Sequence, residues 1–308
     1  MKRNFIARFL GRVPYAKAHA LQEDLVRKRI ANEVGDTILL LEHPPVITLG
    51  RGASRELNTK RELWVEPLGV MPYTEALDFQ RQVAKARISG TIPEDVLLLV
   101  EHPPVVTMGR SAKENHLLAT PALLAARGVE LFEVERGGDV TFHGPGQLVG
   151  YPIFDLKPDR CDVRRYVRDL CEVMIRLAAD FDIEAGQISD DPKKLGVWVD
   201  LDSPKKFSGG LPRVVQETVA HARFGKIGAV GVRLSRWVTM HGIAFNASID
   251  LRGFGLIVPC GVRDQGVSSL ASLGVDPPSL ETLARKAAGH FESVFEADAT
   301  WEEVVSPV

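Results

Sequence analysis

The stretch VTFHGPGQLVGYPIFDL, residues 140–156, places a glycine-rich turn between two β-like segments. With the preceding ERGGD it holds five glycines between residues 135 and 152, and glycine lets the backbone approach a ligand closely. Arg136 could pair with an anionic group, and His143 could donate, accept or move a proton. The same composition also fits a hairpin with ordinary turn glycines. It is neither a P-loop nor a dinucleotide fingerprint, because the Gly-Lys-Ser/Thr ending is absent and the glycine spacing is wrong.

The segments around this stretch alternate between helical and strand periodicity. VLLLV, residues 96–100, is an unbroken apolar run, which is typical of a strand buried on both faces. Residues 162–181 form an amphipathic pattern that predicts a helix with Asp162 as its N-cap. Further strands are expected in GVWVDL, KIGAVGVRL and VTMHGIAFN, and a closing helix follows Ser279. This mixture predicts an α/β (or α+β) fold in one main domain.

A tandem repeat precedes the glycine-rich stretch. TILLLEHPPVITLGRGA (37–53) matches VLLLVEHPPVVTMGRSA (96–112), and Pro-Tyr pairs stand upstream of both. We expect a helix followed by a strand in each copy, over residues 11–57 and 69–115, and a first strand over the basic N-terminus instead of a signal peptide. Two copies are too few for a solenoid. Because the second copy runs into Arg136, it is expected to belong to the main fold, with the first as an added edge unit.

The bulk composition narrows the class of protein. The chain has 308 residues, 45% hydrophobic and 25% charged, with a formal net charge of −2. A soluble globular protein is expected, and a general nucleic-acid binder is disfavoured because neither sign of charge dominates. No apolar run approaches the roughly 18 residues of a membrane span. Three cysteines without a CxxC pair argue against disulfides or structural zinc and favour a reducing cytoplasm.

Cys260 is the candidate nucleophile. It lies between Pro259 and Gly261 after an apolar run, at the end of an expected strand where the thiol could be reached. Cys171 falls on the apolar face of the 162–181 helix and is expected in the core, whereas Cys161 lies in a polar loop. An unassisted thiol is only a few per cent thiolate at neutral pH, so a neighbouring cation would be needed. Lys226, which opens a glycine-spaced strand, could be that cation or simply a solvated edge residue.

Three histidines could be catalytic but are each more typical of satisfied structural residues. His43 and His102 lie in the repeated EHPP, and His241 lies in MHGIAF. No HxxxH, HxH or Cys/His cluster indicates a metal site. A segment rich in Ser, Pro, Gly and Lys at residues 200–223 interrupts the pattern and is expected to be a surface insertion.

Four stretches in register resemble the lipoyl(octanoyl) transferase family. They are EHPPVVTMGR, RGGDVTFHGPGQLVGYPIFDL, KIGAVGVRLSRWVTMHGIAFN and IVPCGV, the last followed by VSSL. The resemblance covers roughly residues 68–295. It implies a mixed sheet flanked by helices, like the catalytic domain of biotin and lipoate protein ligases. It also implies transfer of octanoate from octanoyl-acyl carrier protein to a lysine of a lipoyl domain.

The same resemblance implies the roles of individual residues. Cys260 matches the family's nucleophile, which holds the acyl group as a thioester, and Lys226 matches its activating lysine. The expected substrate pocket comprises Arg136, Gly137, Gly138, Asp139, Val140, Thr141, Phe142, His143, Ala229, Val230, Gly231, Gly242, Ile243 and Ala244. Backbone N–H groups near Gly261 or the HGPG turn could hold the oxyanion.

The resemblance implies partners and excludes cofactors. The donor is octanoyl-acyl carrier protein, which carries phosphopantetheine. The acceptors are lipoyl domains of 2-oxoacid dehydrogenase complexes and the glycine cleavage H protein. No ATP or metal is required, because the substrate is already a thioester, and neither nucleic acid nor membrane is expected as a partner. Alternatives are an ATP-dependent lipoate protein ligase, an amidotransferase between lipoylated proteins, and a degenerate paralogue that binds carrier proteins without turnover.

Three departures from the family pattern stand out. Phe142 replaces the usual tyrosine, so one hydroxyl is expected to be missing from the pocket wall. The insertion 200–223 precedes Lys226, where the family has a short turn. The extra N-terminal copy predicts a division into residues 1–65, packed on the main domain, and residues 66–308, which form the catalytic domain.

Overall fold

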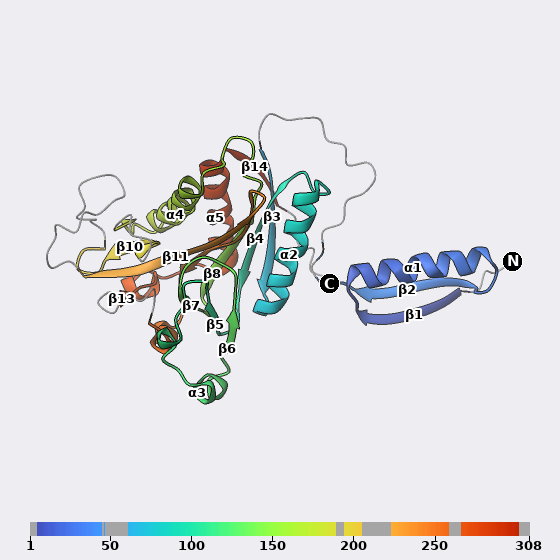
Figure 1. Ribbon diagram of the computed structural model, residues 1–308, viewed down its shortest axis with the longest axis horizontal. Helices are drawn as coiled ribbons and strands as arrows, with labels where there is room; N and C mark the ends of the chain where they lie inside the picture. The colour runs from blue at the N-terminus through green and yellow to red at the C-terminus, as the bar shows by residue number, and fades with distance from the viewer. Residues whose placement is uncertain are drawn as a thin grey trace. The chain divides into compact units, whose positions relative to one another are not determined.

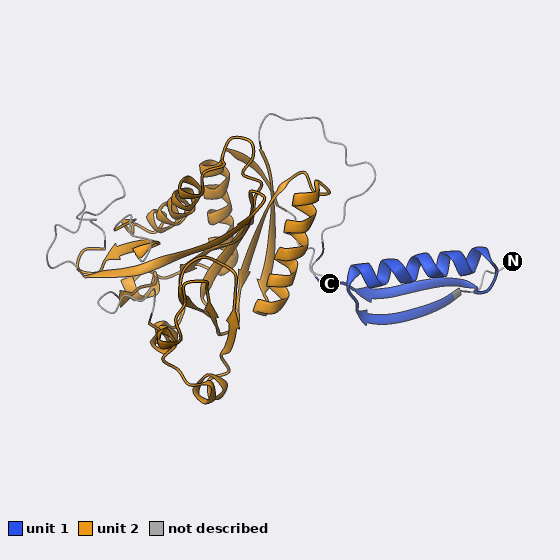
Figure 2. Cartoon of the chain, in the orientation of Figure 1, with its two compact units in different colours: residues 1–55 blue, residues 56–308 orange. Residues whose placement is uncertain are grey.

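The computed structural model describes residues 5–44, 46, 61–188, 194–204, 223–258 and 266–301. The chain divides into two compact units, residues 1–55 and residues 56–308 (Figure 2). The positions of the two units relative to one another are not determined, so the packing of the first on the second stays a prediction. The boundary expected after residue 65 falls inside a strand of the second unit, Arg61–Val70.

The first unit consists of two parallel strands connected by a helix. Its elements are β1 (Phe5–Arg12), α1 (Tyr15–Ile30) and β2 (Asp36–Glu42). The N-terminal strand is confirmed, and it pairs with β2, so the unit is strand–helix–strand and not only the expected helix and strand. Along β2, Leu39 and Leu41 are partly buried, whereas Ile38 and Leu40 are exposed. One face of this two-stranded sheet is therefore open to solvent.

The second unit is built on a nine-stranded mixed sheet (Figure 1). Strands β14, β3 and β4 are parallel to one another, and β4, β8, β12, β11, β10 and β9 follow in antiparallel order. A short strand, β13, pairs in parallel with β11. The mixed sheet expected from the family resemblance is thus present. Across the sheet the strands are β14 (Ala297–Trp301), β3 (Arg61–Val70), β4 (Asp95–Glu101), β8 (Gln147–Ile153), β12 (Val238–Asn246), β11 (Phe224–Ser235), β10 (Val197–Asp200) and β9 (Ala185–Gly186), with β13 (Gly266–Val267) beside β11.

Helices cover both faces of this sheet. Side chains of α4 and α5 form the main core with the sheet, and α2 lies on the opposite face (Figure 1). The predicted cap of α4 is confirmed, because the Asp162 carboxylate accepts hydrogen bonds from the N–H groups of Arg164 and Arg165 at 2.9 and 3.0 Å. Cys171 is fully buried in the core, as expected. The helices are α2 (Tyr73–Ser89), α3 (Pro121–Ala126), α4 (Val163–Ala179) and α5 (Leu280–Phe295).

The glycine-rich turn carries the chain from one sheet to another. A three-stranded sheet has the order β6 (Glu130–Glu133), β5 (Val105–Met108), β7 (Val140–His143). β7 belongs to this small sheet, whereas β8 belongs to the large one, so the two flanks of the turn do not form a hairpin. Gly146 has φ +85°, and a Cβ there would lie 2.6 Å from the Ile249 nitrogen. Only glycine therefore fits where the chain changes sheets.

The expected insertion lies between two strands of the large sheet. β10 ends at Asp200 and β11 begins at Phe224, and residues 205–222 of the insertion lie outside the described residues. In the part of the chain that the structure describes, every helix is too short or too polar to cross a membrane.

Candidate active site

A cavity of about 580 Å³ opens between the three-stranded sheet and the nine-stranded sheet. β7 of the three-stranded sheet and β8, β12 and β11 of the nine-stranded sheet all contribute residues to its lining. Tyr73 at the start of α2 and Leu195 before β10 also line it. Because the cavity lies where two sheets diverge, residues far apart in the sequence meet there.

Most of the predicted site residues line this cavity. They are Lys226, Arg136, Gly138, Asp139, Val140, Thr141, His143, Ala229, Val230, Gly231, Gly242, Ile243 and Ala244. Cys260 lies outside the described residues. The chain that follows it is described again from Gly266, and the next residue, Val267, pairs with Lys226 across β13 and β11.

Two predicted residues, Phe142 and Gly137, do not line the cavity. Side chains alternate along a strand, so Phe142 of β7 points to the side opposite Thr141 and His143. Its ring packs edge-on against Phe254 at 5.6 Å, in a separate apolar cluster. The expectation that Phe142 removes a hydroxyl from the pocket wall is therefore wrong. Gly137 instead donates its N–H to the carbonyl of Val232 at 2.9 Å.

Lys226 is a buried cation and not a solvated edge residue. Only 6% of it is exposed. Its ammonium donates a hydrogen bond to the Leu195 carbonyl at 2.8 Å and lies 4.6 Å from the centre of the Trp198 ring. Trp198 is held in turn by a hydrogen bond from its Nε1 to the Lys194 carbonyl at 2.8 Å. A carbonyl and an aromatic face both attract a cation, so this environment holds the ammonium in one place.

Arg136 provides a second buried cation at the cavity. Its Nη2 donates to the carbonyl and the hydroxyl of Thr107 at 2.8 and 2.9 Å. A Cβ at Gly231 would lie 3.0 Å from the Arg136 Cδ. The missing side chain in β11 therefore leaves room for the arginine.

A chain of buried amides fixes the proton of His143. Asn246 Nδ2 donates to the Ser268 carbonyl at 2.9 Å, so its Oδ1 is free to accept from Gln147 Nε2, also at 2.9 Å. Gln147 Oε1 must then accept from His143 Nδ1, at 2.6 Å. Backbone carbonyls can only accept, so the whole chain has one direction and the Nδ1 of His143 carries the proton. Burial lowers the pKa of His143 to about 3, so the ring is neutral at physiological pH.

A buried histidine and tyrosine, His102 and Tyr151, lie near these hydrogen-bonded amides. His102 Nδ1 donates to the Met71 carbonyl at 2.7 Å, and its Nε2 accepts from the Tyr151 hydroxyl at 2.7 Å. Burial lowers the pKa of His102 to about 4 and raises that of Tyr151. From the sequence, His102 and His241 were possible catalytic histidines but not predicted site residues, and Tyr73 and Tyr151 were neither. Tyr73 and His102 belong to the repeated Pro-Tyr and EHPP runs, whereas Tyr151 follows the glycine-rich turn and His241 lies in MHGIAF.

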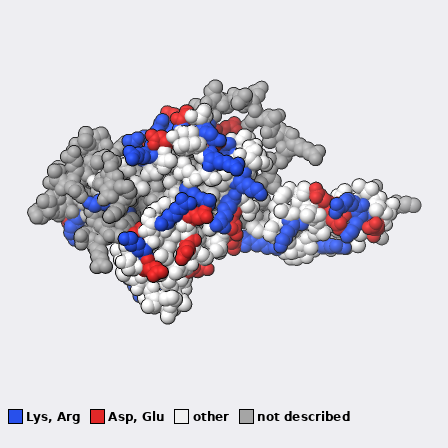
Figure 3. All heavy atoms as spheres, viewed as in Figure 1, with Lys and Arg blue, Asp and Glu red and all other residues white. Residues whose placement is uncertain are grey.

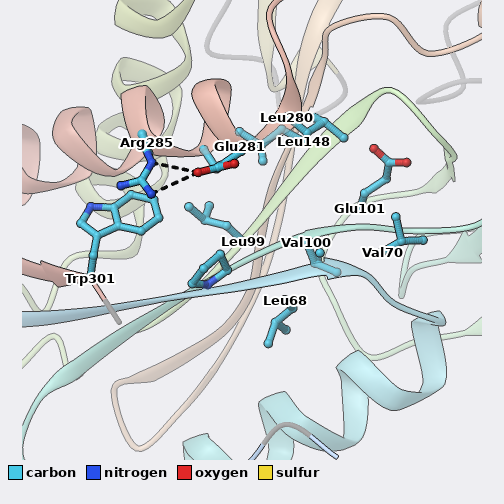
Figure 4. Close-up of a pocket in the computed structure, with 13 residues that line it drawn as sticks. Leu68, Val70, Leu99, Val100, Glu101, Leu148, Leu280, Glu281, Arg285 and Trp301 are labelled. Carbon is cyan, nitrogen blue, oxygen red and sulfur yellow. Dashed lines mark hydrogen bonds and ion pairs between the residues drawn. The ribbon is translucent and has the colours of Figure 1, made fainter. Parts of the chain in front are cut away.

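A second cavity, of about 590 Å³, lies on the α5 side of the large sheet (Figure 4). It is mostly apolar, with Leu99, Leu148 and Leu280 among the residues that line it. Its only described ion pair joins Glu281 and Arg285 of α5, at 3.1 Å. None of the predicted site residues lines it, so the cavity that holds Lys226 is the candidate active site.

Comparisons with known proteins identify the family of the chain. Residues 72–292 match the model of the lipoyl protein ligase A/B catalytic domain. The chain is 43% identical to an octanoyltransferase of Acidobacterium capsulatum, over 77% of this chain and 91% of that protein. It is 46% identical to an octanoyltransferase of Chloroflexus aggregans, over 74% and 93%. A third octanoyltransferase, from Myxococcus xanthus, is 45% identical, and the match covers 75% of this chain and 59% of that protein.

Solved structures show the same fold at much lower identity. A bipartite lipoate protein ligase from Thermoplasma acidophilum superposes with a TM-score of 0.56 and 13% identity, over 80% of this chain and 88% of that one. Lipoate-protein ligase A bound with ATP gives 0.52 and 12%, over 80% and 90%. The fold is therefore that of lipoate protein ligases. The family match and the sequence identities show that the chain belongs to the octanoyltransferase family, among the proteins with a lipoyl protein ligase A/B catalytic domain.

Proposed function

We propose that this octanoyltransferase carries the octanoyl group as a thioester on Cys260, and that Lys226 donates a proton in the first half-reaction and accepts one in the second. The observation that carries the proposal is the burial of the Lys226 ammonium in the cavity, on the strand that pairs with the segment following Cys260. A fixed cation favours a nearby thiolate, because opposite charges stabilise each other.

The proposed first half-reaction transfers the acyl group to the enzyme. The Cys260 thiolate attacks the thioester carbonyl of the donor, and the bond between that carbon and the donor's sulfur breaks. Lys226 gives a proton to the departing thiolate and becomes neutral. A thioester is exchanged for a thioester, so neither ATP nor a metal is needed, as in the other octanoyltransferases of this family.

The proposed second half-reaction forms the amide. The acceptor lysine attacks the acyl carbon, the bond to Cys260 breaks, and Lys226 takes the proton that the amine loses. Valine, isoleucine and alanine side chains of the cavity would contact the octanoyl chain. They are Val149, Val230, Ile243 and Ala244.

The proposed partners follow from this reaction. The donor is octanoyl-acyl carrier protein in the cytoplasm, and the acceptors are lipoyl domains of 2-oxoacid dehydrogenase complexes and the glycine cleavage H protein. Figure 3 shows acidic and basic side chains intermingled on the face in view, without a large field of one sign. Such a surface suits contacts with individual proteins better than binding to nucleic acid.

We also propose that residues 1–65 contain a partial duplicate of the segment that enters the catalytic fold. The support is the repeated sequence, with EHPP runs at 42–45 and 101–104, together with the repeated strand–helix–strand arrangement. Deletion of residues 1–55 tests whether this duplicate is integral. If it is an appendage, the remaining chain folds and transfers octanoate, and if it is integral, the deletion abolishes both.

The direct test measures transfer from octanoyl-acyl carrier protein to a lipoyl domain without ATP. We expect transfer by the full chain, a loss of ~100-fold or more in Lys226→Gln because a positioned proton-transfer group is removed, and normal rates in the control Lys157→Gln, whose side chain is about half exposed. Activity only with ATP and free octanoate would identify a ligase. Transfer only from an octanoylated protein would identify an amidotransferase, and no transfer would identify a degenerate binder.

A further inference from the structure

The rings of a tyrosine and a histidine stack on the cavity wall. The rings of Tyr73 and His143 lie 6.3 Å apart at an interplanar angle of 15°, and both residues line the cavity. Phe132 stacks on Tyr73 at 5.6 Å, and His102 contacts it edge-on at 5.4 Å. Because aromatic neighbours surround the Tyr73 ring, its hydroxyl has little freedom to move.

The Tyr73 hydroxyl is buried without a hydrogen-bond partner among the described residues. Only 2% of Tyr73 is exposed. Burial raises its pKa to about 12, so the hydroxyl keeps its proton and can donate. A buried hydroxyl that makes no hydrogen bond is costly, which indicates that a bound group satisfies it.

His143 offers the complementary group. Its Nδ1 proton is committed to Gln147, so Nε2 has a free lone pair and can only accept. None of the described residues donates a hydrogen bond to this Nε2. The cavity wall therefore presents one donor and one acceptor, carried by two stacked rings.

We propose that Tyr73 and His143 recognise the amide groups of the donor's pantetheine arm, with the hydroxyl donating to an amide carbonyl and Nε2 accepting from an amide N–H. The inference rests on the proposed function. The octanoyl chain has no polar atoms beyond the thioester carbonyl, so it cannot satisfy both groups. The arm carries two amides on a flexible chain, and these offer a carbonyl and an N–H to the same wall. The peptide amides around the acceptor lysine have the same chemistry, and the experiment separates these two sources.

The experiment measures kcat/KM of the full chain with three octanoyl thioesters. These are octanoyl-pantetheine with two amides, octanoyl-N-acetylcysteamine with one, and octanoyl-propanethiol with none. We expect the wild type to prefer octanoyl-pantetheine over octanoyl-propanethiol, and Tyr73→Phe to reduce this preference about 10-fold, which corresponds to one hydrogen bond. The ratio is the readout, so a general loss of activity cancels. Tyr15→Phe makes the same chemical change in the first unit and is expected to leave the ratio unaltered.

A second arm identifies the source of the amide. The acyl-enzyme is formed first and then reacted with a lipoyl domain or with butylamine, which has no amide. If Tyr73→Phe changes this ratio and not the donor ratio, the assignment to the pantetheine arm is overturned. If it changes neither ratio, the recognition of amides is overturned altogether. Failure of the wild type to transfer from any thioester would instead contradict the proposed function.

Thermal unfolding gives an independent readout. Removal of an unpartnered buried hydroxyl costs nothing in the ligand-free protein, so Tyr73→Phe is expected to melt at or above the wild-type temperature. A clearly lower melting temperature would show that the hydroxyl already has a partner within the protein, and would overturn the proposal.

Discussion

The β1–α1–β2 segment and the β3–α2–β4 segment have the same local architecture in different surroundings. Each pairs two parallel strands around a helix that begins after a proline, Pro14 or Pro72. In both, the strand register shifts at a glycine with positive φ, Gly11 at +65° and Gly69 at +60°. Only glycine adopts this conformation easily, so the same bend is encoded twice.

The side chains at the end of each segment repeat the pattern. His43 Nδ1 lies 2.7 Å from the Val13 carbonyl, as His102 Nδ1 lies 2.7 Å from the Met71 carbonyl. The ring of Tyr15 contacts His43 at 5.3 Å and 63°, and Tyr73 contacts His102 at 5.4 Å and 65°. These contacts therefore follow from local sequence alone.

The surroundings distinguish the two segments. In the second unit, β8 and β14 pair with the edges of β4 and β3, and the core side chains of α5 cover one face. Leu99 is 2% exposed there, whereas its counterpart Leu40 in the first unit is 50% exposed. Likewise, His102 meets Tyr151 of β8, and no described residue has this role for His43. Enclosure by other elements, more than local geometry, converts this segment into part of a site.

Lowering the pH should have the largest effect on the free energy of unfolding, because it protonates histidines that are buried in the folded protein. Burial lowers the pKa of His102 to about 4 and those of His143 and His241 to about 3. The unfolded chain then binds more protons below pH 6.5, so stability falls as the pH drops, by about 2 kcal/mol per histidine between pH 6.5 and 5. Asp95 opposes this in part, since burial raises its pKa.

Urea unfolding at pH 7 and pH 5, followed by tryptophan fluorescence, measures this effect in the second unit. All four tryptophans belong to that unit: Trp64, Trp198, Trp237 and Trp301. We expect His102→Gln to reduce the pH dependence and His43→Gln to leave it unchanged. An unfolding free energy that does not change between the two pH values would contradict the account.

Truncation of matched leucines should have the next largest effect. Leu99→Ala removes a core side chain and is expected to lower the free energy of unfolding by about 3 kcal/mol. Leu40→Ala alters an exposed position and is expected to change it by less than about 0.5 kcal/mol. Urea unfolding followed by tryptophan fluorescence measures the effect of Leu99→Ala, and the same unfolding followed by far-ultraviolet circular dichroism, which reports on both units, measures that of Leu40→Ala. Equal losses in the two variants would mean that the first-unit face is as enclosed as the core.

The smallest effect is expected for a matched pair of glutamines. Gln80 Oε1 accepts a hydrogen bond from the backbone N–H of His241 at 2.9 Å, whereas its counterpart Gln22 is exposed. Gln80→Met leaves that N–H unpaired and should cost about 1–3 kcal/mol, and Gln22→Met should cost less than about 0.5 kcal/mol. Hydrogen exchange at the His241 amide provides a local check. Unchanged protection in Gln80→Met would argue against the hydrogen bond.

Sequence patterns predicted the features that depend on local periodicity. The buried strand at VLLLV and the α4 helix with its Asp162 cap are both present, because burial pattern and capping are encoded within a few residues. Most of the residues predicted for the pocket also line one cavity.

Features that depend on pairing between distant segments were not predicted. β7 and β8 belong to different sheets because β7 pairs with β5 and β8 pairs with β12. The orientation of Phe142, away from the cavity, follows from this separation. The tautomer of His143 depends on Asn246, about a hundred residues away. Neither periodicity nor composition carries such information.

The most direct test of the central claim is the mass of the intact full chain after mixing with octanoyl-acyl carrier protein without ATP. The account predicts a gain of one octanoyl group, located by peptide mapping on Cys260, absent in Cys260→Ser, and lost when a lipoyl domain is added. A folded wild-type protein that transfers octanoate without ever forming this adduct, or that forms it on another residue, would contradict the account.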